Sequence, residues 1–239
     1  MKLYSFSRRI DFQTEIDWQE REKILKVSFP LDIRATSARF DIQFGSIERP
    51  ITRNTSWEAA KFEVVGHKWA DLSESGYGVA LLNDCKYGYD VKDSVLRLSL
   101  LKASNFPDYD ADRGLQTVTY SLFPHEEAWF ESDLEREAWT LNNPMLKLPG
   151  TWNAPTSFLS FDRDGICVDA VKKAEDSDSI VLRVHECSGK RGQVNGTFNL
   201  PYSAWQECDL MERPCGESQT GSLSFTIKPF EIKTFLLHP

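Results

Sequence analysis

Apolar and polar residues alternate with a period of two along most of the chain, the pattern of strands that bury one face. The alternating runs cover residues 25–29, 40–44, 96–100, 118–122, 180–184 and 223–227, and an apolar run follows Pro229 over 230–237. Dipeptides typical of turns separate them, namely Asp164-Gly165, Asn195-Gly196 and Cys215-Gly216. We therefore predict an all-β chain of antiparallel strands stacked in sheets.

Two segments depart from this pattern. Residues 126–141 are acidic and space Trp129, Leu134, Ala138 and Leu141 as a helix face would, which predicts a short helix or an ordered loop. Residues 148–155 read Leu-Pro-Gly-Thr-Trp-Asn-Ala-Pro, a sequence typical of a linker. We therefore predict two domains, with residues 1–150 forming part of a large β-sandwich and residues 151–239 a smaller one.

Composition and charge narrow the class of protein. The 239 residues carry a net charge of −8, and Lys and Arg are scattered among acids, which argues against a nucleic-acid binder. The sequence has no apolar run of about 18 residues that would span a membrane, and no apolar stretch typical of a secretory signal follows Met1. Five cysteines without a C-x-x-C pair predict reduced, buried thiols, which favours a cytoplasmic location.

The densest group of polar and aromatic side chains lies in residues 62–90, which hold one Trp, three Tyr, five carboxylates and four Gly. Aromatic residues cluster around His67-Lys68-Trp69 and around Tyr87-Gly88-Tyr89-Asp90. A sugar ring has an apolar face and a polar rim, so a flat aromatic side chain beside charged groups suits it. The same aromatic side chains would also suit packing between sheets or against a neighbouring domain, and the sequence leaves both interpretations open.

Catalytic and metal-binding motifs are missing from the sequence. The four histidines are far apart and form no H-x-x-x-H or H-x-D arrangement, so no zinc site of this chain is predicted. There is no G-x-S-x-G motif, and the 36 acidic residues are too many for a carboxylate pair to be recognised among them. We predict no catalytic and no metal-ligating residues in this chain.

Three segments, residues 49–64, 66–74 and 77–90, closely resemble the C-terminal half of class II α-mannosidases. This is glycoside hydrolase family 38, in particular its cytosolic and vacuolar branch with bacterial relatives. Residues 10–20, 119–125, 168–176, 181–186 and 229–235 extend the resemblance over the whole chain. Two positions depart from the family pattern, since Ile51 and Thr52 stand where Thr and His are usual, and this puts a role of that His in doubt here.

The resemblance implies part of a galactose-mutarotase-like supersandwich, followed by a smaller terminal β-sandwich. Members of the family hydrolyse terminal α-mannosides with retention, using an aspartate nucleophile and a zinc ion carried by an N-terminal α/β barrel. The chain would then be a non-catalytic C-terminal part. Its expected partners are that barrel and mannosides, with no nucleic acid and no membrane, and zinc is expected only in the barrel. The resemblance also implies a homo-oligomeric parent protein.

Within this interpretation, we expect His67, Lys68 and Trp69 to face the sugar pocket. Asp84, Tyr87 and Tyr89 are expected at the contact between this region and the barrel. Two alternatives remain open at this stage: a carbohydrate-binding or assembly module, and a purely structural domain that completes the fold and the oligomer.

Overall fold

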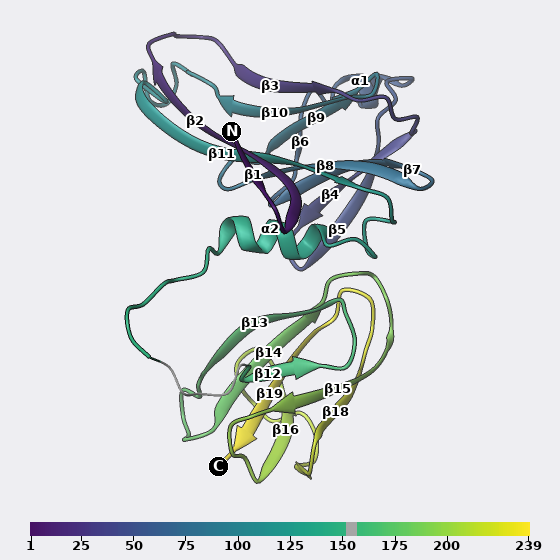
Figure 1. The fold of residues 1–239 in the computed structure, drawn as a ribbon, viewed down its shortest axis with the longest axis vertical. Helices are drawn as coiled ribbons and strands as arrows, with labels where there is room; N and C mark the ends of the chain where they lie inside the picture. Colours follow the sequence, from purple (N-terminus) through teal and green to yellow (C-terminus); the bar gives the residue numbers. More distant parts are fainter. Residues whose placement is uncertain (152–156) are drawn as a thin grey trace. The chain divides into compact units, whose positions relative to one another are not determined.

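The computed structural model describes residues 1–151 and 157–239. Part of the linker-like stretch, residues 152–155, lies outside the described residues. The chain forms two compact units, Met1–Leu146 and Lys147–Pro239, which are described separately below (Figure 1).

Two antiparallel sheets build the first unit (Figure 1). The larger sheet contains, in spatial order, β1 (Lys2–Tyr4), β2 (Ser7–Trp18), β11 (Gly114–His125), β8 (Tyr77–Asn83), β7 (Trp69–Glu74), β4 (Ser37–Ile42) and β5 (Gly45–Pro50). The smaller sheet contains β3 (Leu25–Pro30), β10 (Val95–Leu101), β9 (Gly88–Lys92) and β6 (Val64–Val65).

The main core of this unit lies between the two sheets and follows the predicted alternation. On β10, Leu96, Leu98 and Leu100 are buried, whereas Arg97 and Ser99 between them are partly exposed. The same core includes Phe40, Leu81 and Tyr89, among other residues from both sheets. Since successive side chains of a strand point to opposite faces, one apolar set per strand is enough to fill this core.

The other face of the larger sheet is covered by α2 (Leu134–Asn142), which confirms the helix predicted within residues 126–141 (Figure 1). Leu134 and Ala138 of this helix pack against Ala80 and Leu82 of β8. Val79 and Leu81 of the same strand enter the core between the sheets. Strand β8 is therefore buried on both faces, which explains why its sequence is apolar without alternation.

The second unit is a smaller antiparallel β-sandwich. One sheet contains β12 (Leu159–Phe161), β15 (Gly192–Phe198) and β18 (Leu223–Ile227). The other contains β13 (Ile166–Lys173), β14 (Ile180–Glu186), β19 (Ile232–His238), β16 (Ala204–Cys208) and β17 (Gln219–Thr220). Val184, Val194, Phe225 and Phe235 are among the buried residues that fill the core. The prediction of an all-β chain that ends in a smaller β-sandwich is confirmed.

The turn predicted at Asn195-Gly196 is wrong, because both residues lie inside β15. The side-chain amide and the backbone N–H of Asn195 donate to Asp162, at 2.6 and 2.9 Å. A Cβ atom on Gly196 would lie 3.1 Å from the ring of Phe161. The glycine thus serves close packing between neighbouring strands, not a turn. Asp164-Gly165 and Cys215-Gly216 do lie in connections, between β12 and β13 and between β16 and β17.

The five cysteines, all within the described residues, form no disulfide bond. Cys187 and Cys208 are buried as predicted, whereas Cys85 and Cys215 are exposed, so the prediction of buried thiols is wrong for these two. Among the described residues, neither helix has the length and apolar character needed to cross a bilayer.

Candidate functional site

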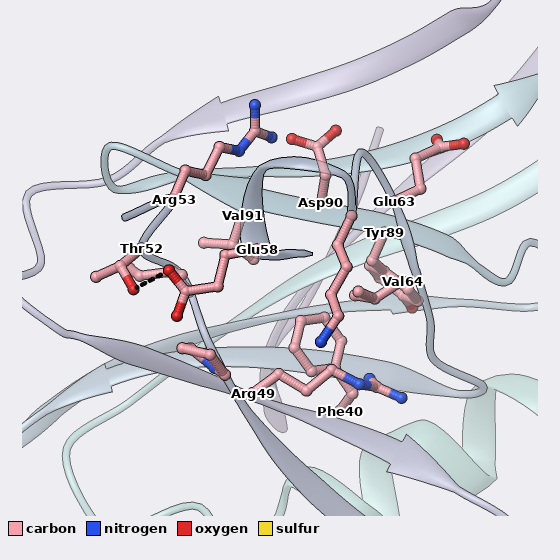
Figure 2. A pocket seen from close by; sticks show the side chains of 13 residues that line it. Phe40, Arg49, Thr52, Arg53, Glu58, Glu63, Val64, Tyr89, Asp90 and Val91 are labelled. Atoms are coloured by element: carbon pink, nitrogen blue, oxygen red, sulfur yellow. Dashed lines mark hydrogen bonds between the residues drawn. The ribbon is translucent and has the colours of Figure 1, made fainter. Parts of the chain in front are cut away.

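A pocket opens in the first unit between the end of β5, the segment 51–63 and strand β9 (Figure 2). The hollow has a volume of about 50 Å³, room for roughly three or four water molecules. It is lined by Phe40, Arg49, Pro50, Ile51, Thr52, Arg53, Glu58, Lys61, Glu63, Val64, Tyr89, Asp90 and Val91.

The segment on one side of the pocket is fixed by the short helix α1 (Ser56–Ala59) and its capping box. The Thr55 hydroxyl accepts from the backbone N–H of Glu58, and the Glu58 carboxylate accepts in return from the backbone N–H of Thr55. Glu58 also accepts from the Asn54 N–H at 2.8 Å and from the Thr52 hydroxyl at 3.3 Å (Figure 2). These bonds hold residues 52–55 in place beside the pocket, and with them Arg53.

The floor of the pocket is apolar and rigid. Phe40 and Tyr89 are 2% and 0% exposed, and a Cβ atom on Gly66 would lie only 3.0 Å from the Tyr89 ring. The Tyr89 hydroxyl points into the core, where it accepts from the Asn83 amide and lies 3.3 Å from the Leu81 carbonyl oxygen. Burial raises the pKa of this phenol far above its usual range, so Tyr89 offers the pocket a neutral ring and no proton chemistry.

The other carboxylates of the pocket already have partners inside the chain. Lys26 lies 2.8 Å from both Glu63 and Asp90, and Arg97 lies 2.7 Å from Asp90. Burial works against the charge on Asp90, but the hydrogen bonds from Lys26 and Arg97 outweigh it and lower its pKa. The pKa of Glu63 is lowered in the same way, by Lys26 and Ser99 against the effect of burial. Both acids are therefore held as carboxylates.

Unlike these carboxylates, three basic side chains of the pocket have no partner of opposite charge among the described residues. Arg49 donates to the Val65 carbonyl oxygen at 2.7 Å, and its guanidinium lies 4.8 Å from the centre of the Phe40 ring. Burial lowers the pKa of Arg49. Within the described parts of the chain, no carboxylate lies at ion-pair distance from Arg49, Arg53 or Lys61. Arg53 and Asp90 lie along one edge of the pocket and Arg49 lies across from them (Figure 2).

The three residues expected to bind substrate lie in different surroundings. His67 is partly exposed, and its ring lies 5.4 Å from that of Tyr87. The ammonium of Lys68 lies 3.1 Å from Asp41 and 2.9 Å from Glu135 of α2. Burial opposes the charge on Lys68, but these two carboxylates outweigh it and raise its pKa. Trp69 is 1% exposed, and its indole N–H donates to Glu135 at 2.8 Å.

The three residues expected at the interdomain contact are also separated. Tyr87 is 53% exposed, whereas Tyr89 is fully buried in the core between the sheets. One carboxylate oxygen of Asp84 accepts from the Thr119 N–H at 3.0 Å, and the other is buried without a partner among the described residues. Of the six predicted residues, the fold brings only His67 and Tyr87 together as an accessible pair of rings.

Sequence reasoning missed Arg49, Arg53 and Lys61 as members of a site. The available signal was their place in residues 49–64, the segment that carries the resemblance to family 38. Spacing alone could not reveal them, because the pocket also needs Tyr89 and Asp90, which are far away in sequence.

No three His, Cys, Asp or Glu side chains of residues 1–151 and 157–239 are grouped so that they could hold a metal ion. The described residues therefore do not fit a zinc site, and no step of a zinc-dependent reaction can be assigned to them.

Two family models match the chain. Residues 1–110 match the glycosyl hydrolases family 38 C-terminal domain, and residues 165–235 match the glycosyl hydrolases family 38 C-terminal beta sandwich domain. The second match falls on the small β-sandwich described above.

Curated relatives match almost the whole chain. Alpha-mannosidase G of Dictyostelium discoideum is 43% identical over 240 residues, which cover 96% of this chain and 22% of that protein. Alpha-mannosidase 2C1 of Homo sapiens is 41% identical over 238 residues, which cover 95% of this chain and 23% of that protein. The chain thus spans about a quarter of the length of the curated relatives that it matches.

The fold also matches solved structures. The crystal structure of an alpha-mannosidase from Enterococcus faecalis V583 superposes with a TM-score of 0.80 at 18% identity, over 97% of this chain and 28% of that one. At this identity the match concerns the fold alone. Together, the two family models and the relatives show that the chain belongs to glycosyl hydrolase family 38, in the C-terminal domains of that family.

Proposed function

We propose that the chain is the non-catalytic C-terminal part of a zinc-dependent, retaining α-mannosidase that hydrolyses terminal α-mannosides. Its partner would be the catalytic barrel of the same parent protein. One observation carries the proposal: relatives named alpha-mannosidase match 95–96% of this chain at 41–43% identity, yet this region makes up only 22–23% of their length.

The chemistry of the described pocket supports a non-catalytic role. A general acid in glycoside hydrolysis needs a raised pKa, so that it still holds its proton near neutral pH. The pKa values of Asp90 and Glu63 are lowered instead, by Lys26, Arg97 and Ser99. Glu58 is engaged by the backbone around α1. These carboxylates stabilise the fold and are not arranged to transfer protons to a sugar.

A chimera tests the proposal directly. The segment of Alpha-mannosidase G that aligns with this chain would be replaced by the chain itself, and hydrolysis of an aryl α-mannoside would be measured. We expect the chimera to be active and the same protein without the segment to be inactive. The chain alone, with added zinc, should show no turnover. Turnover by the chain alone that a chelator abolishes would overturn the proposal.

A second proposal concerns the residues that face the sugar. We propose that His67 takes this role together with Tyr87, because their rings lie 5.4 Å apart and Tyr87 is 53% exposed. An exposed tyrosine ring offers a sugar both an apolar face and a hydroxyl. Lys68 and Trp69 would support the pair from within, through their shared partner Glu135.

Variants of the chimera test this assignment. Tyr87→Ala should raise the KM for the mannoside by about tenfold, the effect of about 1.4 kcal/mol of lost binding, with kcat little changed. Tyr77→Ala is the control, since Tyr77 is also exposed, at 42%, and lies at the start of β8, away from the connection between β8 and β9 that carries Tyr87. Equal kinetics for the two variants would remove Tyr87 from the sugar site.

We also propose a cytoplasmic location for the parent protein. Five cysteines of the described residues form no disulfide bond and two of them are exposed, which suits a reducing compartment better than an oxidising one. Fractionation of cells that produce the parent protein would test this, and recovery from an oxidising compartment would contradict it.

A further inference from the structure

Around the pocket of Figure 2, the acidic side chains have hydrogen-bond partners within the chain, whereas three basic side chains have no carboxylate partner among the described residues. Glu58, Glu63 and Asp90 each accept hydrogen bonds from partners within the chain. Arg49 has a backbone carbonyl oxygen and an aromatic ring as its neighbours, and no carboxylate at ion-pair distance in the described residues. Arg53 and Lys61 likewise have no carboxylate at ion-pair distance among the described residues. With Lys26 and Arg97 behind the acids, five basic side chains meet three acidic ones here.

This local excess of positive charge stands out in a chain whose net charge is −8. Guanidinium and ammonium groups gain most from a bound anion where water is partly excluded. Arg49 is such a group, because burial already lowers its pKa and its fork keeps free donors beside the one bonded to Val65.

The size of the pocket suits a small group. A hollow of about 50 Å³ over a floor of Phe40 and Tyr89 has room for one small anionic group. The guanidinium fork suits the oxygens of a carboxylate or a phosphate, which it can bind with two parallel hydrogen bonds.

We propose that this pocket is an anion-binding site, in which Arg49 and Lys61 hold one carboxylate or phosphate group above the rings of Phe40 and Tyr89, while Arg53 lies at the opposite edge. This site is distinct from the mannosidase role proposed above. The chain can fail to bind an anion and still complete an α-mannosidase. It can also bind an anion and fail to complete one, so each proposal can fail alone.

Calorimetric titration of the chain with sodium phosphate and with sodium acetate, at constant ionic strength, tests the proposal. We expect one site with a dissociation constant on the order of 1 mM, as fits a ligand of four or five heavy atoms. Tighter binding of phosphate would identify a phosphoryl group as the occupant, and tighter binding of acetate a carboxylate. Acetamide has the shape of acetate without its charge and should not bind. Failure of both anions to bind, or equal binding of acetamide, would overturn the proposal.

Variants assign the site to these residues. Lys61→Gln should weaken binding about tenfold, as expected for the loss of one charge-assisted hydrogen bond, and Arg53→Gln, at the opposite edge of the pocket, should weaken it less. Neither side chain is buried, so both variants should fold. Arg191→Gln, at an exposed arginine of the second unit, removes the same charge away from the pocket and should change binding less than about twofold. Unchanged binding in Lys61→Gln would overturn the assignment.

Discussion

The first unit holds two groups of charged side chains that are arranged in opposite ways. Beneath α2, Arg9 lies 2.7 Å from Asp11 and 3.0 Å from Glu137, and the Arg9 side chain is only 8% exposed. At the pocket of Figure 2, Arg49 faces a ring and a carbonyl oxygen. A charge that is buried and paired can fix one element on another, whereas a charge without an acidic neighbour keeps donors for a partner from outside.

The partners of Arg9 show how closely the first group is built. Asp11 also accepts from the hydroxyls of Tyr4 and Ser121, both at 2.7 Å. Burial works against the charge of Asp11, but these bonds and Arg9 outweigh it and lower its pKa. Arg9 further donates to the backbone carbonyl of Glu137 at 2.8 Å, so it links β2 to α2 through both side chain and backbone.

Of the variants that test this comparison, Arg9→Met is expected to lower the free energy of unfolding most. The methionine would leave Asp11 and Glu137 without their shared cation, and removing one partner of a buried ion pair costs about 3–5 kcal/mol in free energy of unfolding. Urea-induced unfolding would measure the loss.

Arg8→Met is the matched control for Arg9→Met. Its neighbour Glu126 is 3.6 Å away and the Arg8 side chain is 61% exposed, so we expect a change of less than about 0.5 kcal/mol. If both variants lose the same stability, the network beneath α2 is not what fixes the helix.

Gly78→Ala is expected to have the next largest effect. Gly78 is paired with Ser73 on one side and His125 on the other, and both side chains lean over it. A Cβ atom there would lie 2.5 Å from the Nε2 atom of His125. His125 cannot move away easily, because Asp71 and the Glu127 carbonyl oxygen hold its two ring nitrogens.

We expect Gly78→Ala to cost about 1–3 kcal/mol of unfolding free energy, as overpacking does elsewhere. Gly216→Ala is the control, since a Cβ atom on Gly216 would meet no atom within 4 Å. A loss no larger than that of the control would mean that the His125 ring yields easily.

His125 of β11 makes the free energy of unfolding of the first unit depend on pH. Burial lowers the pKa of its imidazole, but Asp71 and the Glu127 carbonyl oxygen outweigh burial and raise the pKa above its usual range. The resulting stabilisation is complete below the unfolded-state pKa near ~6.5 and is lost as the pH rises through the folded-state value. NMR titration should therefore give a pKa above about 6.5 for His125.

Asp71→Asn should lower the pKa of His125 and remove this part of the pH dependence of unfolding. The reason is that Asp71 supplies both a hydrogen bond and an opposite charge to the ring. A His125 pKa at or below its usual range in the unchanged chain would contradict the expectation.

The strands could be predicted from the sequence because they depend on local alternation. Leu96, Leu98 and Leu100 point to one face whatever strand lies beside them. Gly196 misled the prediction, because an Asn-Gly pair also suits a strand in which a ring, here that of Phe161, packs against the glycine.

The two groups of charges could not be predicted in this way. Arg9 and Glu137 are 128 residues apart and meet only through the pairing of β2 with the rest of the sheet and the packing of α2. Trp69 and Tyr87 look alike in sequence as aromatic residues among polar ones, yet one is 1% and the other 53% exposed. Tertiary packing decides this difference, and a single sequence does not record it.

Arg49→Met should have the smallest effect, although it is the same substitution as Arg9→Met. The methionine keeps an apolar stem over Phe40, and no carboxylate in the described residues loses its ion pair. The variant loses the contact between the Arg49 guanidinium and the Phe40 ring, which destabilises the fold. It also removes a partly buried positive charge, and this stabilises the fold by a similar amount. We expect the free energy of unfolding to change by less than about 0.5 kcal/mol, measured with urea in phosphate-free buffer.

A loss as large as that of Arg9→Met would show that Arg49 stabilises the fold as Arg9 does, and the contrast between the two groups would disappear. A small change in the free energy of unfolding together with lost anion binding would confirm the contrast between the two groups. Arg49 would then bind a ligand without stabilising the fold.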